Sequence, residues 1–90
     1  MLEIKYSSKF KKDYKKIKFS GRFDIKKLEN VLKDISFQIP LDSSLDDHQL
    51  KGNLSKYREC HIEPDWLLIY KLESTLVIFV RTGSHSELFD

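Results

Sequence analysis

The spacing of hydrophobic residues changes along the chain and marks the first two elements. Residues 2–6 alternate apolar and polar side chains, which predicts a strand with one buried face. Residues 8–18 follow a helical period instead, and Ser7 or Ser8 can cap the start of that helix. The apolar positions of this helix fall at i, i+4 and i+7 on one stripe: Phe10, Tyr14 and Ile17.

A second helix is predicted over residues 24–36, after the Ser20-Gly21 break. Asp24 can cap it. Its apolar stripe consists of Ile25, Leu28, Val31, Leu32 and Ile35. Residues 40–56, rich in Asp, Ser, Gly and Asn, form the longest irregular segment.

Three strands joined by very short connections are predicted for the second half of the chain. Connections this short make an antiparallel meander. The predicted strands are 57–63, 66–72 and 75–82, followed by a loop-like tail. The predicted order is therefore β-α-α-β-β-β in one α+β domain, residues 1–90. Two helices are expected on one face of a small, mainly antiparallel sheet.

Strict alternation assigns the strand residues to faces of the sheet. In the last strand it places Arg81 on the face of Val77 and Phe79. In the first strand of the meander it groups His61 with Tyr57, Glu59 and Glu63. A two-layer sheet leaves one face free, and we expect the functional site on that face.

Composition restricts the class of protein. The chain is 40% hydrophobic and 33% charged, which is typical of a globular protein. Its apolar runs are far shorter than the roughly 20 residues that cross a bilayer, so no membrane association is expected. Cys60 is the single cysteine, which excludes an internal disulfide and favours the cytoplasm.

Positive charge is concentrated in the first third of the chain. Residues 1–33 hold eleven Lys and Arg against four acids, a net charge of +7, whereas residues 34–90 carry −5. Such a segment suits a polyanion such as RNA, or an acidic partner protein. We expect Lys9, Lys12 and Lys16 on the first helix to contact RNA. The alternative is that these lysines only solvate the helix surface.

The candidate chemistry lies in three histidines, all in the second half of the chain. Histidine has an ordinary pKa of about 6.5 and can both accept and donate a proton near neutrality. His48, His61 and His85 lie near predicted strand ends, together with Asp65 and Arg81. This combination points to cleavage of a phosphodiester without a metal. No two of the three histidines have the i,i+2 or i,i+4 spacing typical of metal ligands, so neither a metal nor another cofactor is expected.

Metal-free RNA cleavage requires a base for the 2′-OH, an acid for the departing 5′-oxygen and a cation for the phosphorane. We assign His85 as the acid and Arg81 as the cation. His61 and Asp65 compete for the role of base or of positioning the 2′-OH, and Asp65 also fits a turn after Pro64. His48 is expected to donate to the phosphate or to assist the proton transfers.

Two aromatic residues and the arginine have competing interpretations. Trp66 and Phe89 offer faces on which bases can stack. The alternative for Trp66 is a core position, as for most strand tryptophans. The alternative for Arg81 is a cross-strand ion pair with Glu59 or Glu63.

Several uncommon motifs recur here in the order seen in one known family. They are His-x-Leu-x-Gly from His48, Arg-x-x-His-x-x-Pro-Asp-Trp from Arg58, and Arg-Thr-Gly-x-His-x-x-Leu-Phe from Arg81. With them the chain resembles the YafQ-like branch of the RelE/ParE superfamily of bacterial toxins. The resemblance is strong over residues 47–89. Lys56, where relatives often have Gly, and Asp90, where a small residue is common, depart from the pattern.

The resemblance implies a RelE-like fold and metal-independent endoribonuclease cleavage of mRNA, typically in the ribosomal A site. It implies a cognate antitoxin as the protein partner. It places the proton-transfer positions at His48, His61, Asp65 and His85, supported by Arg81, Trp66 and Phe89. Two other functions remain open: a non-enzymatic ParE-like inhibitor of a protein target, and a co-repressor that acts only with its antitoxin.

Overall fold

The computed structural model describes residues 1–89, so Asp90, one of the two departures from the family pattern, lies outside the described residues. Eight helices and strands are present, with two short 3₁₀ turns, η1 and η2, on either side of β2. Their bounds are β1 Glu3–Tyr6, α1 Ser8–Ser20, α2 Ile25–Ser36, η1 Ser43–Leu45, β2 His48–Gln49, η2 Gly52–Leu54, β3 Arg58–Glu63, β4 Trp66–Leu72, β5 Leu76–Gly83 and α3 His85–Phe89.

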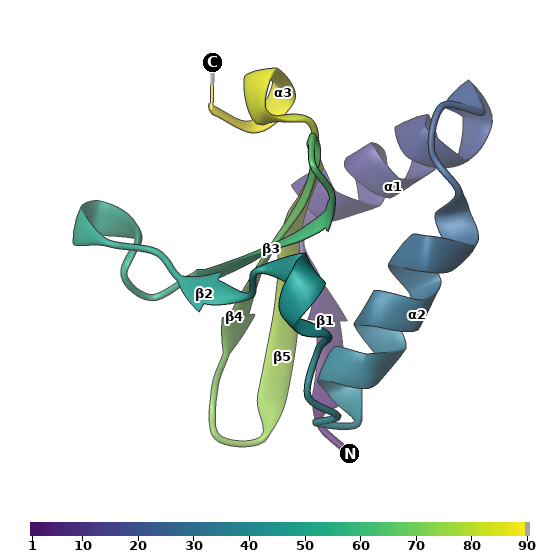
Figure 1. Cartoon of the computed structure of the whole chain (residues 1–90). Coiled ribbons are helices and arrows are strands. Elements are labelled where there is room, and N and C mark those ends of the chain that lie inside the picture. The colour runs from purple at the N-terminus through teal and green to yellow at the C-terminus, as the bar shows by residue number, and fades with distance from the viewer. Residues whose placement is uncertain (90) are drawn as a thin grey trace.

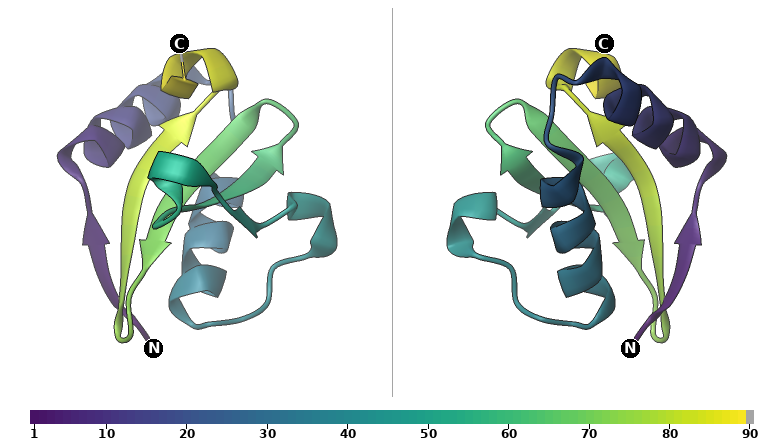
Figure 2. Two further views of the ribbon diagram at one scale, coloured as in Figure 1. Left: turned by 90° about the vertical axis from the view of Figure 1, so that its left-hand side faces the viewer. Right: turned by 90° about the vertical axis from the view of Figure 1, so that its right-hand side faces the viewer.

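The five strands form one sheet in the order β1-β5-β4-β3-β2. β1 runs parallel to β5, and the other neighbouring strands are antiparallel. Helices α1 and α2 lie on one side of the sheet and leave the other side open (Figures 1 and 2). The predicted α+β fold is confirmed. The short strand β2 and the helix α3 replace what the sequence suggested were loops.

The core lies between the helices and the sheet because the apolar stripes of α1 and α2 face the same strands. Ser7 caps α1 by accepting the N–H of Phe10 at 2.9 Å, and Asp24 caps α2. Both caps were among those predicted. Phe10, Leu28 and Phe79 are among the fully buried core residues. Within residues 1–89, no helix has the length and apolar character needed to span a membrane.

A β-bulge in β5 reverses the predicted face of Arg81. Tyr70 pairs with Phe79, but the preceding Ile69 pairs with Arg81, so Val80 is an extra residue in the ladder. Beyond the bulge the alternation is shifted by one position. Arg81 therefore lies on the open face, opposite to Val77 and Phe79, and the prediction that these three share a face is wrong.

A second bulge, at Ile62 in β3, separates Glu63 from His61. His61 pairs with Leu67, whereas Glu63 pairs with Trp66. Glu63 is thereby turned to the helix side, where its carboxylate lies 3.6 Å from Nζ of Lys27 on α2. The predicted grouping of Glu63 with His61 is wrong. His61 and Glu59 remain together on the open face.

Candidate active site on the open face of the sheet

The strand pairing places the predicted acid/base residues in two neighbouring rows of the open face. One row crosses β2 to β5 as His48, Glu59, Ile69 and Arg81. The next row on the same face contains His61, Leu67 and Gly83. His85 follows Gly83 by two residues, at the start of α3. Segments far apart in sequence thus meet at one end of the open face.

The three imidazoles form a line in the order His48, His61, His85. The ring centroids of His48 and His61 are 6.3 Å apart, and those of His61 and His85 are 5.8 Å apart. The side chains are one-quarter to one-half exposed. Two partly exposed imidazoles at this separation can flank a single phosphate group.

Glu59 lies between two of these histidines and was not predicted as part of the site. Its side chain is only 9% exposed. One carboxylate oxygen lies 3.5 Å from Nε2 of His48, and the other lies 3.7 Å from Nε2 of His61. The sequence signal was present, because Glu59 and His61 are two residues apart on one strand face.

His85 is oriented by Asp65. The backbone N–H of His85 and its ring Nδ1 each lie 3.1 Å from Oδ1 of Asp65. These hydrogen bonds, the backbone one first, hold the pKa of the Asp65 carboxyl below its ordinary value, so this carboxylate accepts and Nδ1 carries the proton. The second ring nitrogen, Nε2, is left for a substrate.

A capping box fixes the helix that carries His85. The N–H of Ser84 donates to Glu87 at 3.0 Å, and the N–H of Glu87 donates to the Ser84 hydroxyl at 3.3 Å. Glu87 also pairs with Nζ of Lys16 on α1 at 2.7 Å, and these contacts, Lys16 first, lower its pKa to about 2. Gly83 has a φ of 156°, which favours glycine at the turn into α3.

His48 is held by its neighbours in the chain. Its Nδ1 lies 2.7 Å from the carbonyl oxygen of Asp46, which can only accept, so Nδ1 carries a proton. Asp47 anchors the segment by accepting hydrogen bonds from the Tyr70 hydroxyl and, at 3.2 Å, from Arg58. These contacts keep the two-residue strand β2 on β3.

Arg81 forms an ion pair with Asp13 of α1, and not with Glu59 or Glu63 as the sequence suggested. Nε and Nη2 of Arg81 lie 2.7 and 3.2 Å from the two Asp13 oxygens, and the pKa of Arg81 is raised by these hydrogen bonds. Asp13 also accepts the N–H of Thr82 at 3.2 Å. Two of the five guanidinium N–H groups are thereby used, and three are left for an anion.

The two predicted stacking residues differ in exposure. Trp66 is fully buried, its ring stacks on Phe23 with centroids 4.5 Å apart, and its Nε1 donates to Thr82 at 3.0 Å. Its assignment to base stacking is wrong, because neither ring face is accessible. Phe89 is 47% exposed and its ring lies 6.3 Å from that of His85.

Lys9, Lys12 and Lys16 share one stripe of α1 with Asp13, because they recur at spacings of three and four residues. Asp13 contacts Arg81, and Lys16 contacts Glu87 on α3. This stripe therefore borders the open face beside the C-terminal end of β5, at Arg81 and Thr82. The three lysines are exposed.

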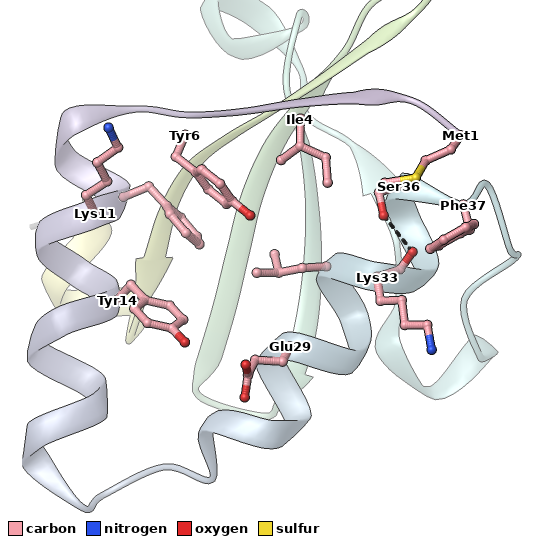
Figure 3. Close-up of a pocket in the computed structure, with 11 residues that line it drawn as sticks. Met1, Ile4, Tyr6, Lys11, Tyr14, Glu29, Lys33, Ser36 and Phe37 are labelled. Atoms are coloured by element: carbon pink, nitrogen blue, oxygen red, sulfur yellow. Dashed lines mark hydrogen bonds between the residues drawn. The ribbon is translucent and has the colours of Figure 1, made fainter.

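A cavity of about 550 Å³ lies on the other side of the sheet (Figure 3). It is an apolar hollow between α1, α2 and β1, lined by Tyr6, Phe10 and Leu32 among others. Tyr14 and Glu29 face each other across it. Burial, then the Glu29 charge, raises the pKa of Tyr14. The histidine cluster lies on the opposite face, so this cavity is separate from it.

No group of three or more His, Cys, Asp or Glu among residues 1–89 has the arrangement of a metal site. The open face instead combines imidazoles, carboxylates held against them and one guanidinium. These are the side-chain types that acid/base catalysis uses, so the fold and the site together define a small α+β protein with the groups needed for proton transfer.

Comparison of this chain with known protein families and solved structures identifies its family. The model of the family described as "Bacterial toxin of type II toxin-antitoxin system, YafQ" matches residues 2–90. This chain belongs to that family of toxins.

Individual relatives agree with this assignment. The chain is 41% identical over 88 residues to the mRNA interferase toxin YafQ of Escherichia coli K12, covering 97% of this chain and 95% of that protein. It resembles YafQ in the E. coli DinJ–YafQ complex with a TM-score of 0.89 and 40% identity, covering all of both chains. It also resembles a metal-bound toxin from Helicobacter pylori, with a TM-score of 0.88, 45% identity and coverage of 99% of this chain and 100% of that one.

Proposed function

We propose that this toxin is an endoribonuclease that cleaves mRNA by metal-independent acid/base catalysis. The observation that carries the proposal is the line of His48, His61 and His85 on one open face, with neighbouring rings 5.8–6.3 Å apart. The relative from E. coli, similar over nearly its full length, is an mRNA interferase. The family and the side-chain chemistry therefore support the same reaction class.

His85 is the general acid in this mechanism. Asp65 accepts from Nδ1, so Nε2 of the imidazolium can donate to the departing 5′-oxygen. Because Asp65 already binds both the backbone and the ring of His85, its role is to position that ring. His61, next in the line, takes the proton of the 2′-OH.

The proton and bond changes then balance. The 2′-oxygen attacks phosphorus as its proton moves to His61, the bond from phosphorus to the 5′-oxygen breaks, and His85 protonates that oxygen. The products are a 2′,3′-cyclic phosphate and a 5′-hydroxyl. The free N–H groups of Arg81, on the same face, bind the phosphorane charge, and His48 supports the proton acceptor.

RNA is held around this centre by Phe89 and by the lysine stripe of α1. Phe89 offers a partly exposed ring beside His85 for stacking. Lys9, Lys12 and Lys16 neutralise phosphates along the border of the open face. We further propose that cleavage takes place on the ribosome, which places the toxin in the cytoplasm.

A cognate antitoxin is the proposed protein partner, as DinJ is for E. coli YafQ. The net charge of +7 on residues 1–33 favours an acidic antitoxin segment. The affinity of such a complex should fall as salt is raised.

The test is cleavage of free mRNA by the purified chain in EDTA, and separately cleavage on translating ribosomes with Mg²⁺ present. His85→Gln should lower the cleavage rate by about 10²–10⁴-fold. Ser86→Ala, its exposed neighbour, is the control and should cut normally. Cleavage abolished by EDTA, or undiminished in His85→Gln, would overturn the mechanism. Growth arrest by His85→Gln with intact transcripts would favour an inhibitor of a protein target.

A further inference from the structure

We infer that Glu59 is a positioning residue that couples His48 to His61 through one carboxylate. The inference rests on the proposed function, because it assigns a role within the same acid/base site. It concerns a residue that was not among the predicted site residues.

The geometry of Glu59 separates it from an ordinary strand carboxylate. Each of its two oxygens lies beside a different imidazole, at 3.5 Å from Nε2 of His48 and 3.7 Å from Nε2 of His61. Both contacts are longer than good hydrogen bonds and act through charge. Glu59 also pairs with His48 across β2 and β3, so the ladder itself fixes one of the contacts.

Because the Glu59 side chain is buried, its carboxylate depends on these contacts for stabilisation. A carboxylate that is 9% exposed has lost most of its hydration and requires nearby positive charge. Within residues 1–89, the ion pairs of Glu59 are those with the two histidines. A proton on either imidazole therefore stabilises Glu59, and Glu59 in turn favours a protonated ring.

The attraction between Glu59 and a protonated imidazole would favour the step in which the base accepts a proton. When His61 takes the 2′-OH proton it becomes a cation beside the Glu59 carboxylate, so the charge formed in the transition state is stabilised. His48, on the other oxygen, is held in reach of the same proton. The site then contains two carboxylate–imidazole units: Asp65 with His85 for the acid, and Glu59 with His48 and His61 for the base.

Other charged groups also face this unit and contribute to its titration. The Asp46 carboxylate lies 3.8 Å from Nδ1 of His48. The remaining groups are Asp47 and Arg58 beside β2, Arg81 in the same row of the sheet, and Asp65 and His85 beyond His61. A test must therefore compare variants in which only Glu59 changes.

The variants are Glu59→Gln, which removes the charge at nearly constant volume, and Glu59→Asp, which keeps it. Glu63→Gln is the matched control, because Glu63 is on the same strand but turned to the helix side. Glu59→Gln should lower kcat roughly 10- to 100-fold. It should leave KM nearly unchanged, because the lost stabilisation concerns the charge that forms on His61 in the transition state and not the binding of RNA. The Asp variant should restore kcat.

A second measurement works without catalysis: NMR spectra of the imidazole nitrogens of the purified chain at one fixed pH. In Glu59→Gln the signals of His48 and His61 should shift, because each ring loses its carboxylate neighbour, while those of His85 should stay. If the signals of His48 and His61 do not move, or if the Asp variant fails to restore kcat, Glu59 is only structural and the inference is wrong. A wild-type chain that cuts no RNA would refute the proposed function, and the NMR spectra would still test the coupling.

Discussion

At the scale of single residues, the site depends on which side chains are exposed and which are buried. His48, His61, His85 and Phe89 are at least partly open to solvent, whereas Trp66 and Cys60 are fully buried. The sequence motifs contain residues of both kinds side by side. Two predictions at this scale separate them.

The first concerns the two aromatic residues. Trp66→Ala should destabilise the fold by about 3–5 kcal/mol, because it removes a buried ring stacked on Phe23 and a hydrogen bond to Thr82. Phe89→Ala should change stability by less than about 0.5 kcal/mol and weaken RNA binding by about 1–3 kcal/mol. Urea unfolding and RNA titration measure the two effects. A stable Trp66→Ala chain would contradict the core assignment.

The second concerns Cys60. Burial, aided by the nearby Asp47 and Glu59 charges, raises the pKa of its thiol to about 12. The reactive thiolate is therefore scarce at pH values near 8, and the side chain is buried as well. A thiol-specific disulfide reagent should modify the folded chain orders of magnitude more slowly than the chain unfolded in guanidinium. Rapid labelling of the native protein would show that this part of the core opens readily.

At the scale of elements, the short helix α3 presents His85 to the site. It has only five residues, so its own backbone hydrogen bonds cannot stabilise it. The Ser84–Glu87 capping box, the Lys16–Glu87 pair and the contact of His85 with Asp65 do so instead. The tail that the sequence suggested was a loop is ordered by this capping box and by these tertiary contacts.

Glu87→Gln tests this anchoring. The pKa of Glu87 is about 2 in the folded chain against an ordinary 4.5, so its charge stabilises the fold above pH 4.5 and that contribution is lost as pH falls towards 2. The variant should lose about 1 kcal/mol or less at neutral pH and little at the acidic end. The control is Glu73→Gln, whose pair with Lys71 connects residues of the β4–β5 hairpin and does not involve α3. Equal losses in urea unfolding at both pH values would contradict the ionic contribution.

At the scale of the whole molecule, the two faces of the sheet have different roles. Helices α1 and α2 cover one side of the sheet and leave the other side open (Figure 2). The helix side holds the core and the apolar cavity, and the open side holds the imidazoles. α1 serves both, because its apolar stripe enters the core while another stripe carries lysines past Arg81. The charge on that stripe should guide RNA to the open face.

The role of the lysine stripe can be tested by comparing two triple variants that have the same net charge. Replacing Lys9, Lys12 and Lys16 with Gln should weaken RNA binding and reduce the slope of log K against log salt by about 2. The matched control replaces Lys11, Lys15 and Lys18, which are also spaced by one turn but lie on a different side of α1. If both triple variants lose affinity equally, RNA binding depends on net charge alone and the stripe has no special role.

The sequence by itself determined the order of the two long helices and the four longer strands, the helix caps and the candidate histidines, because these follow from local periodicity, capping residues and uncommon motifs. It also indicated the family. It did not predict β2 or α3. Only the tertiary structure decided the faces of Arg81 and Glu63, since each depends on one unpaired residue in a ladder and strict alternation gives no sign of a bulge. The burial of Trp66, the pairing of Arg81 with Asp13 and the place of Glu59 between two imidazoles were decided in the same way. They arise from contacts between segments far apart in the chain, which local patterns do not encode.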